Sequence, residues 1–208
     1  MRGLFSYYIN LSKRRFLLFM SLLIIVILIS IFESAHELVL LYLGFLPTIL
    51  LAYSYDQKYK KFVFERLIPV KVRNIIRTQY LVIVLYSLMG CLLSLLYLLI
   101  LKKMDVNLDF NEQITNIKLI TLFSINLNIS ILISSLIKEK KIYKIFAFGV
   151  PVLQSLITFK DKIEILNIDN QINFFSQQNM ELNNIIVTIL YILISLPISY
   201  RFYKNYCK

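Results

Sequence analysis

The chain has 208 residues, 58% of them hydrophobic, and a formal net charge of +11. Its apolar residues are concentrated in blocks of roughly 16–22 residues, long enough to cross a hydrocarbon core about 30 Å thick, and this excludes a soluble globular protein. The basic residues flank these blocks, as topology determinants do, so we expect no nucleic-acid partner.

Residues 1–15 predict an amphipathic helix that lies on the inner surface of the membrane. Its polar side carries Arg2, Ser6, Asn10 and Lys13, and its apolar side carries Leu4, Phe5, Tyr8 and Leu11. The alternative is a disordered leader, but the helical spacing of the two sets favours the helix.

Six apolar blocks follow, and each predicts a transmembrane helix because an isolated strand cannot satisfy its backbone in lipid. The predicted spans are residues 16–32, 38–53, 80–101, 117–137, 142–159 and 185–200. Apolar residues occupy consecutive positions, unlike the alternating pattern of an outer-membrane barrel. We therefore predict an all-α polytopic membrane helix bundle that forms a single domain over residues 1–208.

The distribution of Lys and Arg predicts that both ends of the chain are cytoplasmic. With the N-terminus inside, 18 of the 23 basic residues fall in inside segments and five fall outside, as the positive-inside rule requires. Two cytoplasmic ends need an even number of spans, which supports the fifth span although Gly149 and Pro151 interrupt it. We expect a multi-pass protein in contact with lipid in the bacterial plasma membrane.

The longest predicted cytoplasmic loop, residues 55–79, has a pattern of its own. A short amphipathic helix would place Phe64, Leu67 and Ile68 on one face, and Pro69 would end or kink it. A second helix starting near Val70 could then run directly into the third span. Such a helix–break–helix offers a firm surface at the membrane for another protein.

The stretch that follows, Ile-Pro-Val-Lys-Val-Arg-Asn-Ile-Ile-Arg-Thr-Gln-Tyr-Leu at residues 68–81, resembles the loop between the second and third helices of ABC-2 type transporter permeases. The matching positions are Pro69, Val70, Ile75, Ile76, Tyr80 and Leu81, and the departures are Lys71, Val72 and Gln79. The resemblance in topology extends over nearly the whole chain.

This resemblance implies a permease that pairs with a second permease subunit, as a homodimer or heterodimer, and docks a cytoplasmic ABC ATPase through a coupling helix near residues 58–68. The residues that it places nearest the ATPase are Phe64, Arg66, Leu67, Pro69 and Lys71. The compact size and the loop variant most resemble permease subunits of the exporter for phenol-soluble modulins, which are amphipathic secreted peptides.

The chain itself is not expected to hydrolyse ATP. A Walker A loop ends in Gly-Lys-Ser/Thr, and none of its four glycines precedes a lysine. ATP and magnesium are therefore expected in the partner ATPase, with no cofactor bound by this chain. His36, the only histidine, is expected in an exposed loop; because no second histidine exists, no metal site is predicted.

Two other classes of function remain as alternatives. A non-transporting immunity or sensor protein could use the same six-helix scaffold. An intramembrane enzyme is the least supported alternative, because the chain has no Gly-rich serine motif and no paired histidines. No acidic residue lies inside any block, so a proton or cation relay has no evident carrier.

Polar residues are concentrated in the fourth block and continue in the fifth. Asn126 and Ser130 share one helical stripe, and Asn128 lies on a neighbouring one. Small polar residues of this kind commonly join helices in a bundle. The alternative is that Asn126, Asn128 and Ser130, together with Gln154, line a translocation path, and a path without fixed charge would favour apolar or amphipathic cargo.

Overall fold

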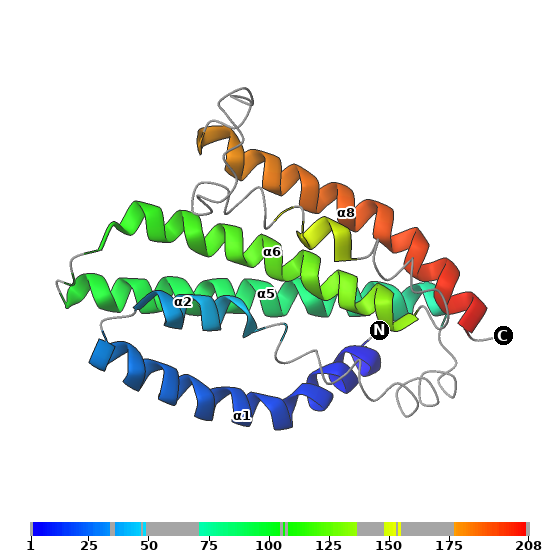
Figure 1. Ribbon diagram of the computed structural model, residues 1–208. Helices are drawn as coiled ribbons and strands as arrows, with labels where there is room; N and C mark the ends of the chain where they lie inside the picture. Colours follow the sequence, from blue (N-terminus) through cyan, green and yellow to red (C-terminus); the bar gives the residue numbers. More distant parts are fainter. Residues whose placement is uncertain are drawn as a thin grey trace.

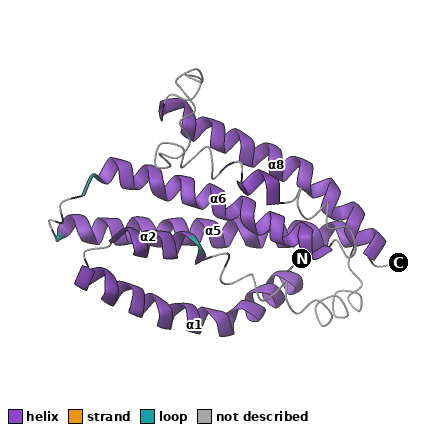
Figure 2. Ribbon diagram, in the orientation of Figure 1, coloured by secondary structure: helices purple, strands orange, loops and turns teal. Residues whose placement is uncertain are grey.

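The computed structural model describes residues 2–33, 36–46, 48, 71–104, 106, 108–136, 148–152, 154 and 177–206 (Figure 1). The helices are α1 (Arg2–Glu33), α2 (His36–Gly44), α5 (Val72–Lys103), α6 (Phe110–Leu136) and α8 (Gln177–Tyr206). A short helical segment also covers residues 148–152. In this part of the chain all regular structure is helical (Figure 2), which confirms the predicted all-α class.

Within the described ranges, three helices are long and apolar enough to cross a membrane, namely α5, α6 and the Leu182–Lys204 part of α8. They contain nearly all of the predicted third, fourth and sixth spans. The first predicted span lies in α1, and α2 covers the beginning of the second. Most of the fifth predicted span lies outside the described residues, so the number of six spans stays a prediction.

The predicted surface helix and the predicted first span belong to one continuous helix, α1. Figure 1 shows that the first turns of α1 are bent away from the rest of the helix. Ser6 and Asn10 are exposed and Tyr8 is buried, as the predicted faces require. Gln79 Nε2 of α5 donates a hydrogen bond to the Tyr8 hydroxyl at 2.8 Å, so the first turns of α1 are attached to the bundle.

Helix α6 is the most enclosed of these three helices. It packs against α5, α8 and α2. Of the most apolar 18-residue stretch of each helix, 61% is buried in α6, compared with 28% in α5 and 17% in α8. A helix surrounded by other helices can carry polar side chains in a membrane because neighbouring helices supply their hydrogen-bond partners. The polar pattern of the fourth block therefore belongs to the centre of the described bundle.

The outward faces of α5 and α8 carry large apolar side chains. On α5 the exposed leucines are Leu81, Leu85, Leu88, Leu92, Leu96 and Leu99. The buried face of the same helix includes the small residues Ser87, Gly90 and Ser94. Small residues inside and large apolar residues outside are typical of a helix that packs within a bundle and faces lipid on its other side.

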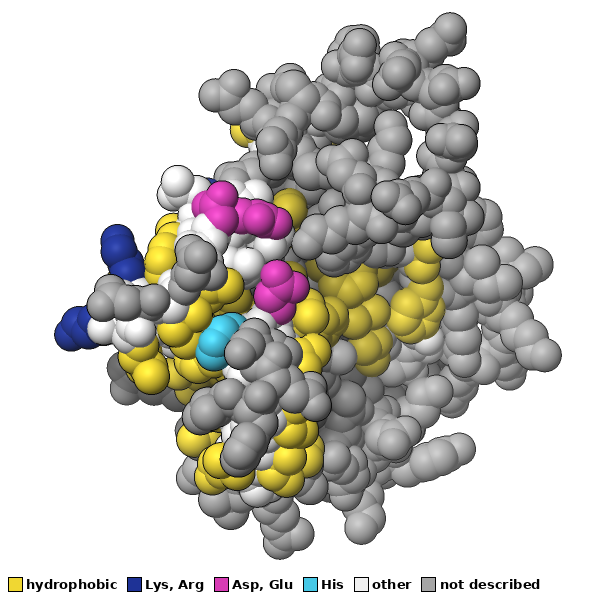
Figure 3. Space-filling view, turned by 60° about the vertical axis from the view of Figure 1, so that its left-hand side comes forward, with side chains coloured by type: hydrophobic (Ala, Val, Ile, Leu, Met, Phe, Trp, Pro, Cys, Tyr) yellow, Lys and Arg dark blue, Asp and Glu magenta, His cyan; other side chains and the backbone are white. Residues whose placement is uncertain are grey.

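Charge separates the two ends of the bundle. Where α5 begins and α8 ends, the described charged residues are Lys71, Arg73, Arg77, Arg201 and Lys204, all basic and exposed. At the opposite end the described charged residues include Glu37, Asp109 and Glu112 together with Lys102 and Lys103. Figure 3 looks toward this second end, where acidic side chains and the histidine lie near lysine or arginine side chains.

Candidate functional site

The residues predicted to couple the chain to an ATPase lie directly before α5. Phe64, Arg66, Leu67 and Pro69 are outside the described residues, whereas Lys71 is exposed and is the N-cap residue of α5, with extended backbone at φ −60° and ψ 132°. The start of α5 at Val72 agrees with the predicted second helix, which runs into the third span without a break. Lys71 is thus held at the end of a 32-residue helix.

The four residues predicted to line a path are all buried within the chain: Asn126, Asn128 and Ser130 are 0% exposed and Gln154 is 2% exposed. Asn126 Nδ2 donates to Gln154 Oε1 at 2.5 Å and to Thr188 Oγ1 of α8 at 3.0 Å.

The orientation of the Asn126 amide follows from the hydroxyl beside it. Thr188 Oγ1 donates to the backbone carbonyl of Asn184 at 2.8 Å, so it can only accept a hydrogen bond from Asn126. A flipped amide would place two acceptors against each other at this contact. Asn126 of α6 is therefore the donor, and Thr188 of α8 the acceptor, of the hydrogen bond between these helices.

A second contact joins the same two helices one turn further along. The Ser130 hydroxyl donates to the backbone carbonyl of Asn126 at 2.9 Å. The Tyr191 hydroxyl of α8 lies 2.7 Å from Ser130 Oγ and is then the donor of that pair. Asn126, Ser130 and Gln154 thus belong to one network that faces α8.

Asn128 belongs to a different contact. Its Nδ2 donates to Thr48 Oγ1 at 3.0 Å and to the backbone carbonyl of Ser124 at 2.7 Å. The four predicted residues therefore do not meet on one surface. Their burial and their partners on other helices favour the helix-packing alternative, and a path along them stays a prediction.

The partner side of this network, on α8, was not predicted from the sequence. The buried polar residues of α8 are Asn184, Thr188, Ser195 and Ser199, to which Tyr191 adds a hydroxyl group. They recur every three or four residues on a helix whose other faces are apolar, so a search for polar residues at helical spacing would have found them. Ser199 Oγ also lies 2.9 Å from the hydroxyl of Tyr80 on α5.

The prediction that His36 lies in an exposed loop is wrong. His36 is the first residue of α2 and is partly buried. Its Nδ1 lies 3.0 Å from Ser30 Oγ of α1 and 3.1 Å from the Tyr97 hydroxyl of α5. These polar contacts hold three helices together, and the partner on α5 is too far along the sequence to be inferred from residues around His36.

The same cluster bears on the enzyme alternative, since it pairs a serine with a histidine. The side chain of Ser30 is 0% exposed, so in this arrangement a substrate has no access to its hydroxyl group. Among the residues that the structure describes, no group of three His, Cys, Asp or Glu side chains could hold a metal ion. The Ser30–His36–Tyr97 contact is accounted for by its role in packing.

Two glycines allow α2 to approach its neighbours closely. A Cβ atom added at Gly90 of α5 would lie 2.6 Å from the backbone carbonyl oxygen of Leu43 in α2. A Cβ atom at Gly44 would overlap the side chain of Ile120 in α6. The small residues Ser87, Gly90 and Ser94 are a sequence signal for such an approach.

A family model agrees with the membrane character of the apolar helices and with the resemblance seen around residues 68–81. The family model described as ABC-2 family transporter protein matches residues 5–204. Searches among curated proteins and among solved structures find no match. Because the family match extends over nearly the whole chain, this protein belongs to the ABC-2 family of membrane transporter proteins.

Proposed function

We propose that the chain is the transmembrane permease subunit of an ATP-driven exporter in the bacterial plasma membrane. The observation that carries this proposal is the family match over residues 5–204. A separate cytoplasmic ATPase would bind ATP and magnesium, and a second permease subunit would complete the membrane part. The proposed cargo is an amphipathic or hydrophobic peptide, on the resemblance to exporters of phenol-soluble modulins.

The position of α5 supports a mechanism for coupling. The proposed coupling loop, residues 55–79, ends within the first turns of α5, and α5 continues for 32 residues, or about 48 Å at 1.5 Å per residue. Helix α5 also packs against α1, α2, α6 and α8. A displacement of the loop by the ATPase could therefore reach the opposite end of the bundle through one unbroken helix.

A cargo without strong charge fits the described interior. The buried polar side chains between α6 and α8 are amides and hydroxyl groups. Asn126 donates to Gln154 and Thr188, and Ser130 contacts the Tyr191 hydroxyl. Peptides with an apolar face could instead move along apolar surfaces between subunits. We therefore propose that the path involves surfaces shared with the second permease subunit, and that Asn126, Asn128, Ser130 and Gln154 hold the helices in place beside it.

The proposed orientation predicts a difference in labelling between the two ends. In a chain with Cys91→Ser and Cys207→Ser, a membrane-impermeant maleimide should label Asn111→Cys in intact cells, because Asn111 is exposed at the start of α6, on the predicted outer side. Arg201→Cys should be labelled only after the cells are permeabilised. The reverse pattern, or equal labelling of both sites in intact cells, would contradict two cytoplasmic ends.

The coupling proposal predicts that Phe64→Asp and Leu67→Asp each abolish association with the ATPase. A carboxylate on the apolar face of the proposed coupling helix would have to be buried at the docking surface, at a cost of several kcal/mol. The measurements are co-purification of the ATPase with the full chain in nanodiscs and export of an amphipathic helical peptide from cells. Both should be lost together.

Leu166→Asp is the matched control, because it makes the same change in a predicted outer loop and should leave association and export intact. Loss of association in the control as well would indicate misfolding. If the unaltered chain co-purifies with no ATPase in any detergent or nanodisc, the permease proposal fails and a sensor or immunity role on the same scaffold becomes the better explanation.

A further inference from the structure

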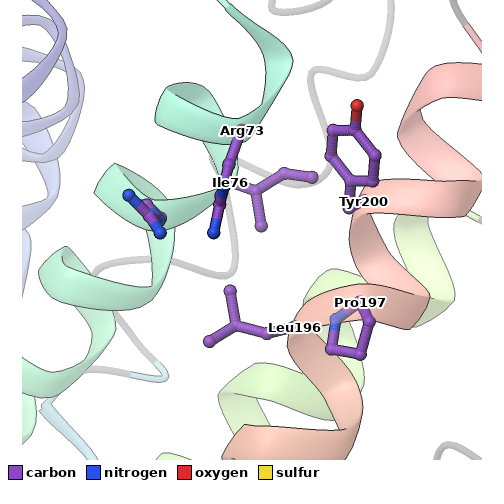
Figure 4. Close-up of a pocket in the computed structure, with 6 residues that line it drawn as sticks. Arg73, Ile76, Leu196, Pro197 and Tyr200 are labelled. Carbon is purple, nitrogen blue, oxygen red and sulfur yellow. The ribbon is translucent and has the colours of Figure 1, made fainter.

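A cavity of about 400 Å³ lies between the start of α5 and the second half of α8. The described residues that line it are Arg73, Ile76, Arg77, Leu196, Pro197 and Tyr200. Figure 4 shows Arg73 and Ile76 on α5 across the gap from Leu196, Pro197 and Tyr200 on α8. The cavity is at the end of the bundle where the described charged residues are all basic.

The lining combines two kinds of chemistry. Arg73 and Arg77 are exposed and lie one turn apart on the same helix, so both guanidinium groups can reach one anion. Within the described part of the chain, neither arginine has an acidic partner. The remaining walls are mostly apolar and come from Ile76, Leu196 and Pro197.

The position of the arginines at the start of α5 adds a second electrostatic argument. The first turn of α5 contains no acidic residue, and the N-cap residue Lys71 makes no side-chain hydrogen bond to the helix. The start of a helix carries a partial positive charge, which basic side chains make more positive. An anion placed there would interact favourably with the helix and with both guanidinium groups.

We propose that this cavity binds an anionic phospholipid, with its phosphate at Arg73 and Arg77 and its upper acyl chain against Leu196 and Pro197. The apolar wall favours a lipid over a free phosphate ion or a hydrated carboxylate of the ATPase. The exposed face of α8 continues away from the cavity through Leu193 and Ile194, which are 60% and 59% exposed, so an acyl chain would have an apolar surface to follow.

This inference does not depend on export, because a lipid could occupy the cavity whether or not the chain moves cargo. The predicted orientation places the cavity in the inner leaflet. It also places the lipid directly beside the end of the proposed coupling loop.

The test is a competition between lipids on the purified full chain. The chain is exchanged into detergent with equal amounts of phosphatidylglycerol and phosphatidylcholine, and the bound lipids are counted by native mass spectrometry. The preference for phosphatidylglycerol should fall by roughly tenfold in the double variant Arg73→Gln, Arg77→Gln, since basic side chains near a membrane surface each contribute to anionic lipid binding. The matched control is Arg201→Gln, Lys204→Gln, which removes the same charge from exposed positions outside the lining and should keep the preference.

The double variant Arg73→Lys, Arg77→Lys should keep part of the preference, because lysine retains the charge and loses the planar fork that binds two phosphate oxygens. Gel filtration of every variant checks that the fold is kept. The proposal is overturned if both glutamine pairs lower the preference equally, since that would indicate only general attraction to the membrane surface.

It is also overturned if inorganic phosphate displaces phosphatidylglycerol completely, which would identify a site for the free ion. A third contradicting outcome is an unchanged lipid preference in Arg73→Gln, Arg77→Gln with loss of ATPase co-purification. That result would assign the two arginines to docking of the ATPase.

Discussion

Gly90→Ala should destabilise the folded protein by about 1–3 kcal/mol, as overpacking does in other tightly packed interiors. The added Cβ atom would lie 2.6 Å from the Leu43 carbonyl oxygen, and this neighbour is backbone, which cannot rotate away. Helix α2 must then move away from α5. The loss should appear although alanine is intrinsically a better helix former than glycine by roughly 0.5–1 kcal/mol.

The measurement is unfolding of the purified chain in mixed micelles, followed by circular dichroism because the chain contains no tryptophan. Gly149→Ala is the matched control, since Gly149 is in a helical segment and a Cβ atom there meets nothing within 4 Å among the described residues. It should be neutral or slightly stabilising. Equal stability of the two variants would show that α2 and α5 are not in close contact.

Asn126→Leu should lower the stability of the bundle by roughly 1–2 kcal/mol, the upper range for a hydrogen bond between membrane helices. The change removes both side-chain bonds from α6 to Gln154 and Thr188. The amide of Gln154, 2% exposed, would lose its described partner and could not be solvated. The measurement is the same unfolding experiment, combined with peptide export from cells.

A double-mutant cycle with Gln154→Leu tests the specific contact. If Asn126 and Gln154 are paired, the double variant should be less destabilised than the sum of the two single variants. Asn111→Leu, at an exposed position of the same helix, should have little effect. A variant at Asn126 with unchanged unfolding and reduced export would instead support the translocation-path alternative.

The parts of the fold that could be predicted are those that depend on neighbouring residues. Hydropathy over a window of about 20 residues identifies a span, and this located α5, α6 and the membrane-spanning part of α8. Helical spacing also placed Asn126 and Ser130 on one face, since residues four apart lie one above the other. The Ser130–Asn126 contact and the shared network agree with that assignment. Asn128, predicted on a neighbouring stripe, instead faces Thr48.

The spacing of residues predicts which face of a helix is buried, but not which other helix that face contacts. Residues 126 and 128 are two apart, so they point about 200° from each other around the helix. That one faces α8 and the other faces Thr48 depends on how the helices are arranged. The position of His36 between Glu33 and Glu37 suggested a solvent-facing loop. In the fold, its Nδ1 instead contacts Ser30 and the hydroxyl of Tyr97, which lies 61 residues further along the chain.

The amino-acid order therefore specifies the membrane class, the positions of the long helices and membership of the ABC-2 family, because hydropathy, charge and motif are properties of short segments. The packing of helices specifies the contacts: Gly90 against the backbone of α2, Asn126 against α8, and two arginines of α5 beside the apolar wall of α8. These depend on distances between segments far apart in the chain. These contacts form only when the helices pack together. Packing is favoured because helices that stay apart in lipid would leave polar groups without partners and spaces unfilled.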